Sequence, residues 1–378
     1  MRIVSYEMGI VRIPLHTPFK TALRTVERVE DVVVKLTADD GTVGFGEAPP
    51  TKAITGEDLE SIQRAIRERI VPALRALPED ADVRAVLTCI QECCAGNTSA
   101  KAAADIAVHD LAARQAHLPL YRYLMRVYGI GGEELSRPVL HTDLTISVNA
   151  VSQMQEDARI ALRRGFRSVK IKVGREGEKD LERIRAIRDV VGDDAAILVD
   201  ANQGWTAKEA LSVLQRAQEL GLNLSLVEQP VPAADLAGMA AVTAGTTYPV
   251  AADESCFHPE DARRIFEMGA ADLVNIKLMK CGGLMEAQKI ADYARSAGKH
   301  CMVGCMLESG IAVGAAAHFA AAQGDLVTVT DLDGPMLCAE NPYAGGTVFD
   351  GPEIRLNRSP GLGIERIDPS YLNSQEWW

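Results

Sequence analysis

The sequence has little that would direct the chain out of the cell or toward a charged polymer. Its first residues, Met1–Glu7, lack the apolar core of a signal peptide. The longest apolar stretch, Gly310–Ala322, is rich in Ala and Gly and is interrupted by His318, which predicts a packed helix and not a membrane span. The formal net charge of −12 argues against nucleic acid or an anionic membrane as the main partner. We therefore expect a cytoplasmic protein.

Paired cysteine motifs are also missing. The 8 cysteines form no C-x-x-C pair and match no histidine motif, which favours reduced, mostly buried thiols over disulfides or zinc ligands. Low-complexity runs and charge blocks, which would mark a disordered tail, are absent as well. The composition, 47% hydrophobic and 24% charged residues, is typical of a soluble globular protein. The length of 378 residues suggests two domains or one elaborated barrel.

The N-terminal part has the pattern of a small α+β domain. Strand-like alternation covers residues 3–13, 31–38 and 42–47, with Asp39-Asp40-Gly41 as a turn. The segment Thr17–Arg28 has no clear period and is interpreted as a loop. Helices are expected from an N-cap at Thr55 or Asp58 to about Leu77, and over Ala100–Ala116.

From about Val139 the pattern changes to alternating strands and helices. The expected strands are Leu144–Val148, Ser168–Val173, Ala196–Asp200, Ser225–Glu228, Val250–Asp253, Leu273–Lys277, Cys301–Cys305 and Val327–Thr330. Amphipathic helices between them include Ala150–Gly165, Lys179–Val191, Ala207–Leu220 and Gly283–Ala297. This alternation predicts a (β/α) barrel. A doubly wound open sheet is the alternative, but it would usually carry a glycine-rich phosphate loop, which the sequence lacks.

Three consecutive strands each end in a carboxylate, namely Asp200, Glu228 and Asp253. Any one of them could be an ordinary helix N-cap. In a barrel, however, neighbouring strand ends meet at one mouth, where three acids would repel one another. A hard divalent cation with oxygen ligands relieves that repulsion, and Mg²⁺ is the natural choice.

Lysines flank the three acids. Lys170 and Lys172 point to one face of a strand, where they are either solvated on an exposed edge or placed at the barrel mouth. In the second case each would lower the pKa of the other and leave one ready to act as a base. Lys277 ends the sixth strand, and Lys280 is a weaker candidate that more simply caps a loop.

Further polar residues have weaker signals. Asp331 and Asp333 follow the eighth strand on one face, where they either act in the site or are merely solvated. Arg24 and Lys52 lie in expected loops and, taken alone, are solvated. His300 and His318 match no ligand spacing and are structural or solvated.

These motifs together resemble the enolase superfamily in its muconate-lactonizing subgroup, over almost the whole chain. The resemblance implies an α/β protein with an α+β capping domain (1–130), a modified (β/α)7β TIM-like barrel (131–345) and a C-terminal segment (346–378) that completes the capping domain. It also implies a K-x-K at Lys170 and Lys172, Mg²⁺ on Asp200, Glu228 and Asp253, and a lysine at Lys277.

The pair Asp331 and Asp333 is similar to the D-x-D of dipeptide epimerases, where two acids hold the substrate's α-ammonium. The stretch Pro18–Thr25 resembles the substrate loop of L-Ala-D/L-Glu epimerases, in which an arginine, here Arg24, receives the Glu side chain. The resemblance implies 1,1-proton transfer at the Cα of the C-terminal residue through an enediolate. Lys172 and Lys277 would be the two bases, and Lys170 would hold down the pKa of Lys172.

Other functions stay open. A dipeptide epimerase with a different second-residue preference is one of them. The o-succinylbenzoate synthase and muconate cycloisomerase reactions use the same kind of site, although their substrates carry no ammonium group for the D-x-D pair. A non-catalytic binding barrel would not need the full set of lysines and acids. Acid-sugar dehydratases use histidine bases, which these strand ends lack. A homo-oligomer is possible.

Overall fold

The computed structural model describes residues 1–20, 25–131, 139–174 and 176–377, and its largest sheet has 8 parallel strands in the order β12-β11-β10-β9-β8-β7-β6-β5. The strands are β5 (Leu144–Ile146), β6 (Ser168–Lys172), β7 (Ala196–Asp200), β8 (Leu224–Glu228), β9 (Val250–Ala252), β10 (Leu273–Ile276), β11 (His300–Gly304) and β12 (Val327–Asp331). Every expected barrel strand is therefore confirmed, with small differences at the ends.

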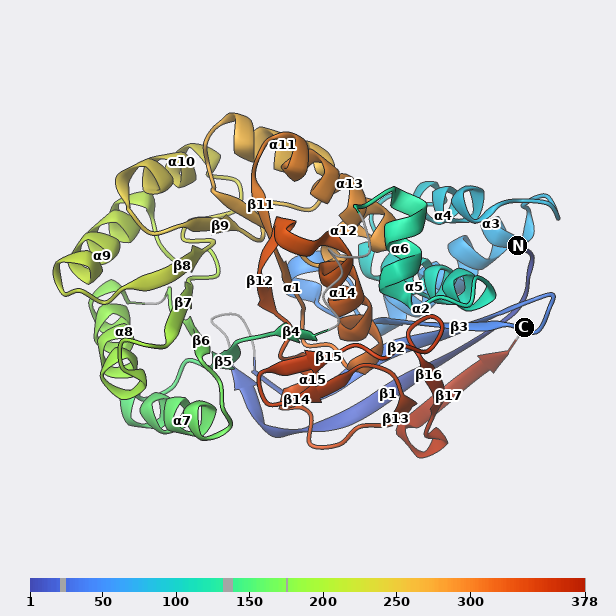
Figure 1. Ribbon diagram of the computed structural model, residues 1–378, viewed down its shortest axis with the longest axis horizontal. Coiled ribbons are helices and arrows are strands. Elements are labelled where there is room, and N and C mark those ends of the chain that lie inside the picture. The colour runs from blue at the N-terminus through green and yellow to red at the C-terminus, as the bar shows by residue number, and fades with distance from the viewer. Residues whose placement is uncertain (21–24, 132–138, 175, 378) are drawn as a thin grey trace.

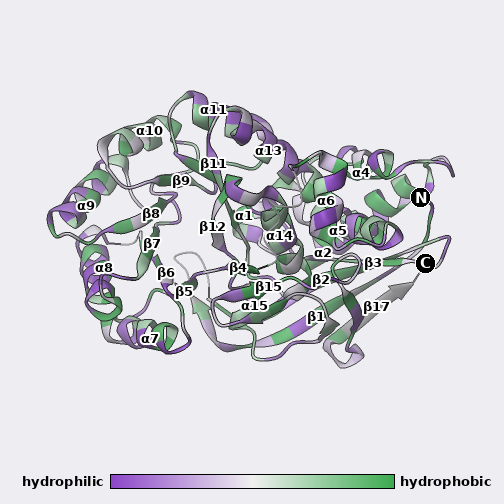
Figure 2. Ribbon diagram, in the orientation of Figure 1, coloured by the Kyte–Doolittle hydropathy of each residue, from purple (hydrophilic) through white to green (hydrophobic). Residues whose placement is uncertain are grey.

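Helices connect these strands, and most of them lie along the outer side of the curved sheet (Figure 1). They are α7 (Val151–Arg163), α8 (Gly177–Val191), α9 (Ala207–Glu219), α10 (Leu236–Gly245), α11 (Pro259–Glu267), α12 (Leu278–Cys281), α13 (Leu284–Ser296) and α14 (Gly310–Gln323). In Figure 2 the strands β7 to β9 are mainly hydrophobic, whereas α8 and α9 mix hydrophobic and hydrophilic residues. This is expected of strands covered on both faces and of helices with one solvated side.

The first and last barrel strands approach each other, so the sheet nearly closes. The backbone N–H of Leu332 donates to Thr142 Oγ1 over 2.8 Å, and the N–H of Thr145 donates to Asp333 Oδ2 over 2.7 Å. Strand β12 is the eighth strand of the barrel and is followed directly by the short helix α15 (Gly334–Leu337), which gives the predicted (β/α)7β order. The doubly wound alternative is excluded by this closure.

The capping sheet is antiparallel, with the order β17-β1-β2-β3. Its strands are β1 (Ile3–Lys20), β2 (Thr25–Ala38), β3 (Val43–Ala48) and β17 (Leu372–Trp377). The helices of this part are α1 (Lys52–Thr55), α2 (Leu59–Ala65), the π-helical η1 (Ile66–Ile70), α3 (Val71–Arg75), α4 (Val83–Glu92), α5 (Thr98–Gln115) and α6 (Leu120–Tyr128). Because β17 pairs with β1, the two chain ends lie side by side in Figure 1.

The interpretation of Thr17–Arg28 as a loop is wrong for the described residues at both of its ends. β1 extends to Lys20 and β2 begins at Thr25, and Phe19 pairs with Val26 in a two-stranded ribbon. The register shifts between Pro14 and Phe19, so the strand loses its regular alternation there. The ribbon is partly exposed, and it therefore carries no hydrophobic period that a sequence could reveal.

Helix α5 packs directly on β3 because both contribute small residues. A Cβ on Gly46 would lie 1.8 Å from the carbonyl oxygen of Ala103, and one on Gly44 would lie 2.1 Å from that of Ala107. Only glycine permits this approach of a strand to a helix backbone. The contact fixes the capping sheet against the helix that faces the barrel.

Helix α14 is buried throughout, as expected for a packed alanine-rich helix, and it lies between the barrel and the capping domain (Figure 1). Among the described residues, no helix is long and apolar enough to cross a bilayer. The remaining elements are β4 (Val139–His141), η3 (Gly324–Leu326), β13 (Tyr343–Gly345), β14 (Val348–Asp350), β15 (Glu353–Arg355), β16 (Ile364–Ile367) and η4 (Pro369–Tyr371). β15 pairs with β4 and β17 pairs with β1, so the C-terminal segment contacts both parts of the molecule.

Candidate active site

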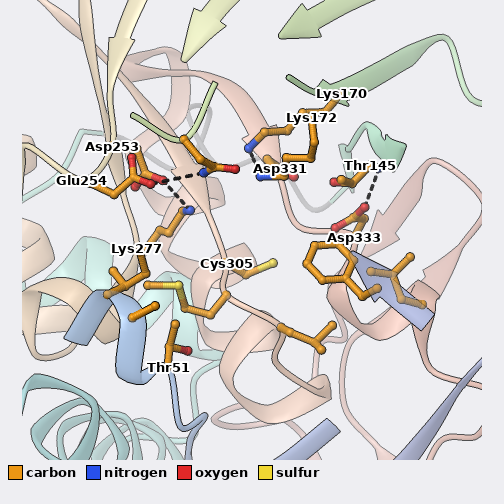
Figure 3. Close-up of a pocket in the computed structure, with 17 residues that line it drawn as sticks. Thr51, Thr145, Lys170, Lys172, Asp253, Glu254, Lys277, Cys305, Asp331 and Asp333 are labelled. Atoms are coloured by element: carbon orange, nitrogen blue, oxygen red, sulfur yellow. Dashed lines mark hydrogen bonds and ion pairs between the residues drawn. The ribbon is translucent and has the colours of Figure 1, made fainter. Parts of the chain in front are cut away.

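A cavity of about 80 Å³ lies at the carboxyl ends of the barrel strands (Figure 3). Its barrel side is lined by Thr145, Lys170, Lys172, Asn202, Asp253, Glu254, Lys277, Cys305, Met306, Leu307, Asp331, Asp333 and Leu337. The capping domain covers it with Phe19, Thr51, Ala53 and Ile54. The cavity therefore lies where both parts of the chain meet.

The three strand-end acids are neighbours, as the spacing predicts. Asp200 and Glu228 end β7 and β8 and are paired in register, and Asp253 directly follows β9. All three are buried. Burial would raise the pKa of Asp200, but Lys172 and Lys170 outweigh it and hold the pKa below the ordinary value. Burial and the nearby Asp200 raise the pKa of Glu228 to about 7.

Lys170 and Lys172 reach this acid cluster from β6. Lys170 Nζ lies 3.1 Å from Asp200 Oδ2, 2.5 Å from Glu228 Oε2 and 2.6 Å from Asp331 Oδ2, while Lys172 Nζ lies 2.6 Å from Asp200 Oδ2. Burial alone would lower the pKa of Lys170, yet the surrounding carboxylates raise it well above its usual value. The pKa of Lys170 is thus shifted upward, whereas a neighbouring lysine would shift it downward, because the effect of the carboxylates is larger than that of Lys172.

Lys277 follows β10 and approaches the cavity from the side away from Lys172 in Figure 3. Its Nζ lies 2.7 Å from Asp253 Oδ2. Burial would lower the pKa of Lys277, but Asp253 and Glu228 raise it. The cavity therefore has one strand lysine on each of two sides.

Lys280 holds backbone carbonyl oxygens at the strand ends, as a loop cap would, and also pairs with the buried Asp253 carboxylate. Its side chain is 1% exposed, and Nζ lies 2.6 Å from Asp253 Oδ1 and 3.0 Å from the carbonyl oxygen of Asn275. Helix α12 begins at Leu278 and turns this side chain back under the strand ends. Asp253 is consequently held by two lysines.

The D-x-D acids lie on the opposite side of the cavity from Asp253. Asp331 ends β12 and contacts Lys170, and Asp333 accepts the Thr145 N–H. Burial and Asp331 raise the pKa of Asp333 to about 6. Asp143 is also buried and lies close to Asp331 and Asp333. Burial, together with Asp331, raises the pKa of Asp143 well above the ordinary value.

Among the other described residues singled out in the sequence, Lys52, His300 and His318 do not line the cavity. Arg24 lies outside the described residues. Lys52 points away from the cavity, since its side chain is 77% exposed and its Nζ pairs with Asp58 over 3.2 Å. His300 is exposed, and His318 is buried in α14, where it accepts the Tyr121 N–H and burial lowers its pKa to about 3. All 8 cysteines are free.

Three polar residues near the acids are missed by the sequence interpretation. Asn275 donates to Glu228 Oε1 over 2.7 Å, and Asn202 donates to Glu254 Oε1 over 3.2 Å. Burial and Asp253 raise the pKa of Glu254 to about 8. The acid doublet Asp253-Glu254 was a readable signal, because two acids at a strand end exceed what one N-cap needs. Asn275, in the middle of an apolar strand, was another.

The donor chemistry around the cavity fits Mg²⁺. The described residues contain no group of three or more His, Cys, Asp or Glu side chains arranged to hold a metal as they stand, and Lys170 lies between Asp200 and Glu228. Buried carboxyl groups nevertheless outnumber the ammonium groups here, and Glu254 Oε2 is buried without a hydrogen-bond partner. The carboxyl groups are those of Asp143, Asp200, Glu228, Asp253, Glu254, Asp331 and Asp333, and the ammonium groups are those of Lys170, Lys172, Lys277 and Lys280. An excess of carboxyl groups over ammonium groups and all-oxygen donors suit a hard divalent cation.

A capped (β/α)7β barrel with lysines on two sides of an acid-rich mouth defines a class of enzymes that move a proton on a carbon acid. Residues 153–369 match the enolase C-terminal domain-like family, and residues 5–124 match the N-terminal domain of mandelate racemase and muconate lactonizing enzyme. The chain belongs to this family, as its motifs predict.

Several relatives that match over nearly their full length are epimerases. The chain is 46% identical over 361 residues to the L-Ala-D/L-Glu epimerase of Clostridium acetobutylicum, which covers 96% of this chain and 98% of the relative. It resembles the substrate-liganded L-Ala-D/L-Glu epimerase of Bacillus subtilis with a TM-score of 0.92 at 43% identity, covering 97% and 99% of the two chains. The Enterococcus faecalis dipeptide epimerase complexed with Mg and L-Leu-L-Tyr has a TM-score of 0.89 at 36% identity, covering 97% and 100%.

Proposed function

We propose that this protein is a Mg²⁺-dependent dipeptide epimerase that inverts the Cα of the C-terminal residue, with L-Ala-D/L-Glu as its substrate pair. The names of its relatives support the reaction class and the dipeptide. The observation that carries the proposal is the approach of Lys172 and Lys277 to one small cavity from different sides (Figure 3). A 1,1-proton transfer with inversion needs a base on each face of the carbon.

The proton to be removed is weakly acidic because its carbon adjoins a carboxylate. Lys172 and Lys277 are assigned as the two bases: one accepts the Cα proton, the other returns a proton to the opposite face, and the roles exchange for the other stereoisomer. Lys170 keeps its positive charge among Asp200, Glu228 and Asp331, and it is assigned as an electrostatic neighbour of Lys172.

Asp200, Glu228 and Asp253 are the residues that would hold Mg²⁺. When bound, the ion supplies positive charge that stabilises the second negative charge on the substrate carboxylate after the Cα proton leaves. Lys170 and Lys172 would then release the Asp200 oxygen that they share in this structure.

Asp331 and Asp333 are assigned to the substrate's α-ammonium group. Both are buried and line the same cavity as the lysines, and a cation there would offset the acid excess on that side. Arg24 is assigned to the Glu side chain, on its position in the stretch that resembles the substrate loop of L-Ala-D/L-Glu epimerases. A guanidinium suits a carboxylate because it can bind both oxygens.

The test is to incubate the purified protein with L-Ala-L-Glu and to follow the formation of L-Ala-D-Glu, with and without EDTA. Epimerisation that stops with EDTA and returns with Mg²⁺ supports the proposal. Full activity in EDTA would contradict the metal assignment, and activity on L-Ala-L-Leu but not L-Ala-L-Glu would contradict the Glu assignment alone. Arg24→Met is expected to lower kcat/KM for L-Ala-L-Glu by roughly ten- to hundred-fold, since a charged hydrogen bond contributes about 1.5–3 kcal/mol.

Expectations about location, partners and assembly belong to the same proposal. We infer a cytoplasmic enzyme without a nucleic-acid or membrane partner, on the basis of its acidic charge and free thiols. Assembly into a homo-oligomer is a further expectation, which sedimentation of the purified protein would test.

A further inference from the structure

We infer that Asp105 of the capping domain is a positioning residue for Lys277. It holds the barrel segment that follows Lys277, and it therefore supports one of the two proton transfers more than the other. The inference rests on the proposed function, because it needs two bases. It gives the capping domain a part in the chemistry besides covering the cavity.

Asp105 lies on helix α5 and binds the barrel backbone directly. Its carboxylate is fully buried and accepts the N–H of Leu284 over 2.6 Å and, more weakly, the N–H of Met285 over 3.4 Å. These residues begin α13, and the first N–H groups of a helix have no partner within it. A Cβ on Gly283 would lie 2.4 Å from Asp105 Cγ, so only glycine permits the barrel backbone to come this close.

A short path leads from this contact to Lys277. Lys277 is the N-cap of α12, a helix of 4 residues, and α13 begins soon after that helix ends. The N–H of Gly283 donates to the carbonyl oxygen of Leu278 over 2.9 Å, which ties the start of α13 to the start of α12. A single helical turn is not stable by itself. The position of α12, and with it the backbone of Lys277, therefore depends on β10 at one end and on Asp105 at the other.

The Asp105 carboxylate is held from within the capping domain as well. His109 Nδ1 lies 2.9 Å from the carbonyl oxygen of Asp105 and 3.1 Å from Oδ1, and His109 Nε2 lies 2.9 Å from the hydroxyl oxygen of Tyr128. Because both neighbours of Nδ1 are acceptors, Nδ1 carries the hydrogen and Nε2 accepts the Tyr128 O–H. A neutral imidazole thus satisfies the whole row and fixes the direction of the carboxylate toward the barrel.

Lys172 is anchored in another part of the barrel. It ends β6, and β7, β8 and β9 lie between that strand and β10. A shift of the α12 segment would therefore move Lys277 and leave Lys172 in place. A displacement of about 1 Å can lower a rate about a hundredfold. Loss of the Asp105 contact should consequently affect the two faces of the reacting carbon unequally.

The experiment measures deuterium incorporation at the Cα of the C-terminal residue in D₂O, with L-Ala-L-Glu and L-Ala-D-Glu as separate substrates and with saturating Mg²⁺. The isomer that still exchanges in Lys172→Ala defines the face of Lys277, and the one that still exchanges in Lys277→Ala defines the face of Lys172. Asp105→Asn keeps the size of the side chain but removes its charge and one acceptor oxygen. It should lower exchange of the Lys277 isomer about tenfold relative to the Lys172 isomer, and epimerisation should fall with the slower face.

Asp110→Asn is the matched control. Asp110 lies on the same helix, is fully buried and accepts the N–H groups of Phe45, over 2.9 Å, and Leu362, over 2.6 Å, neither of which belongs to the barrel sheet. This variant should lose stability but keep the wild-type ratio of exchange between the two isomers. Gly283→Ala disturbs the Asp105 contact from the barrel side, and it should shift the ratio in the same direction as Asp105→Asn.

Amide hydrogen exchange gives a second measurement that does not depend on activity. In Asp105→Asn the amides of residues 278–285 should exchange about tenfold faster than in the wild type, because the segment has lost its contact with α5. The amides of β6 should keep their wild-type rates.

The possible failures are distinguishable. A wild type that epimerises neither dipeptide, or lysine variants without opposite preferences, would contradict the proposed function and the inference with it. Where the lysine variants behave as expected, equal loss of exchange for both isomers in Asp105→Asn would overturn only the positioning role. The same holds if the amides of residues 278–285 keep their wild-type rates, or if Asp110→Asn shifts the ratio as much as Asp105→Asn does.

Discussion

Asp253 shows how single residues keep their charge in the cavity. Its carboxylate is buried and contacts Lys277 over 2.7 Å and Lys280 over 2.6 Å, one lysine on each oxygen. Burial would raise its pKa, but the two lysines hold the pKa far below the ordinary value. An acid kept ionised in this way can serve a metal at any physiological pH. Lys280 has no assigned chemical step, so its role is to compensate the buried charge of Asp253.

Lys280→Met is therefore expected to destabilise the protein through Asp253. Removing one partner of a buried ion pair typically costs about 3–5 kcal/mol, because the other charge remains buried. The free energy of unfolding in urea should fall by that order in EDTA, and by clearly less with saturating Mg²⁺, which would compensate Asp253 instead. Lys289→Met removes a half-exposed pair with Glu286 and should cost less than about 1 kcal/mol in either condition. Equal losses for Lys280→Met with and without Mg²⁺ would argue against a metal at Asp253.

The raised pKa of Asp333 predicts that substrate binding weakens at acid pH. Burial, then repulsion by Asp331, raises its pKa to about 6. Below that pH the carboxyl group gains a proton and loses the charge that attracts an ammonium group. The KM for L-Ala-L-Glu should consequently rise by about tenfold per pH unit below pH 6. The charges of the dipeptide change little between about pH 5 and 7, since its carboxylates titrate lower and its amine higher. A KM that stays flat across this interval would contradict the role of Asp333.

At the scale of elements, Glu47 joins the capping sheet to the barrel. This residue of β3 is fully buried and accepts the N–H groups of Ser309, over 3.2 Å, and Ala312, over 2.8 Å. Both belong to the start of α14, where a carboxylate also complements the helix dipole. Ser309 Oγ contacts Glu47 and the hydroxyl group of Tyr343. The segment just before α14 lines the catalytic cavity, so this contact ties the cavity wall to the capping domain.

Glu47→Ala should lower both stability and catalysis. It leaves buried N–H groups at the start of α14 unpaired, at about 1–3 kcal/mol for such a group. It also frees the segment with Met306 and Leu307 that lines the cavity, so kcat/KM should fall by about tenfold or more through lost positioning. Asp82→Ala removes a different N-cap, that of α4, where Asp82 accepts the Ala85 N–H over 2.8 Å. It should cost about 1 kcal/mol and leave kcat/KM unchanged. If both variants lose only stability, Glu47 does not position the cavity wall.

For the molecule as a whole, the barrel could be predicted from the sequence because its strands are short apolar runs that end in charged residues. Parallel strands covered on both faces show this pattern strongly, and Asp200, Glu228 and Lys277 interrupt it only where each strand reaches the mouth. The direction of Lys172 follows from strand alternation alone. The sequence alone thus predicts that these residues meet at the barrel mouth.

The rest depends on contacts that no local pattern encodes. The ribbon of β1 and β2 near Phe19 is partly exposed and irregular in register, so it looked like a loop. Lys280 is turned inward by the short helix α12, which is capped at its C-terminal end by Gly282 with a φ of 100°. The spacing of three residues from Lys277 does not reveal that direction in the sequence. Lys52 points outward although its neighbours Thr51 and Ala53 line the cavity. Each depends on a turn geometry set by tertiary packing. The domain boundaries at residues 130 and 345 stay predictions.

Because buried acids are in excess, Mg²⁺ should stabilise the whole molecule. An ion that binds only the folded state adds about 2.7 kcal/mol at a concentration of one hundred times its Kd. The midpoint of thermal unfolding should therefore rise with Mg²⁺ concentration in the wild type. Glu228→Ala should abolish the rise, because it removes one of the three proposed oxygen ligands. A wild-type midpoint that does not respond to millimolar Mg²⁺ would contradict the metal site.

Lys172 and Lys277 are assigned to opposite faces of the same carbon, and inversion depends on both. The measurement that tests this assignment most directly is deuterium incorporation at the Cα of the C-terminal residue in D₂O, with L-Ala-L-Glu and L-Ala-D-Glu as separate substrates. Lys172→Ala and Lys277→Ala should both lose epimerisation. Each should still exchange deuterium into the one stereoisomer whose proton faces the remaining lysine, and the two variants should show opposite preferences. Epimerisation near the wild-type rate in either variant, or the same preference in both, would contradict the two-base account.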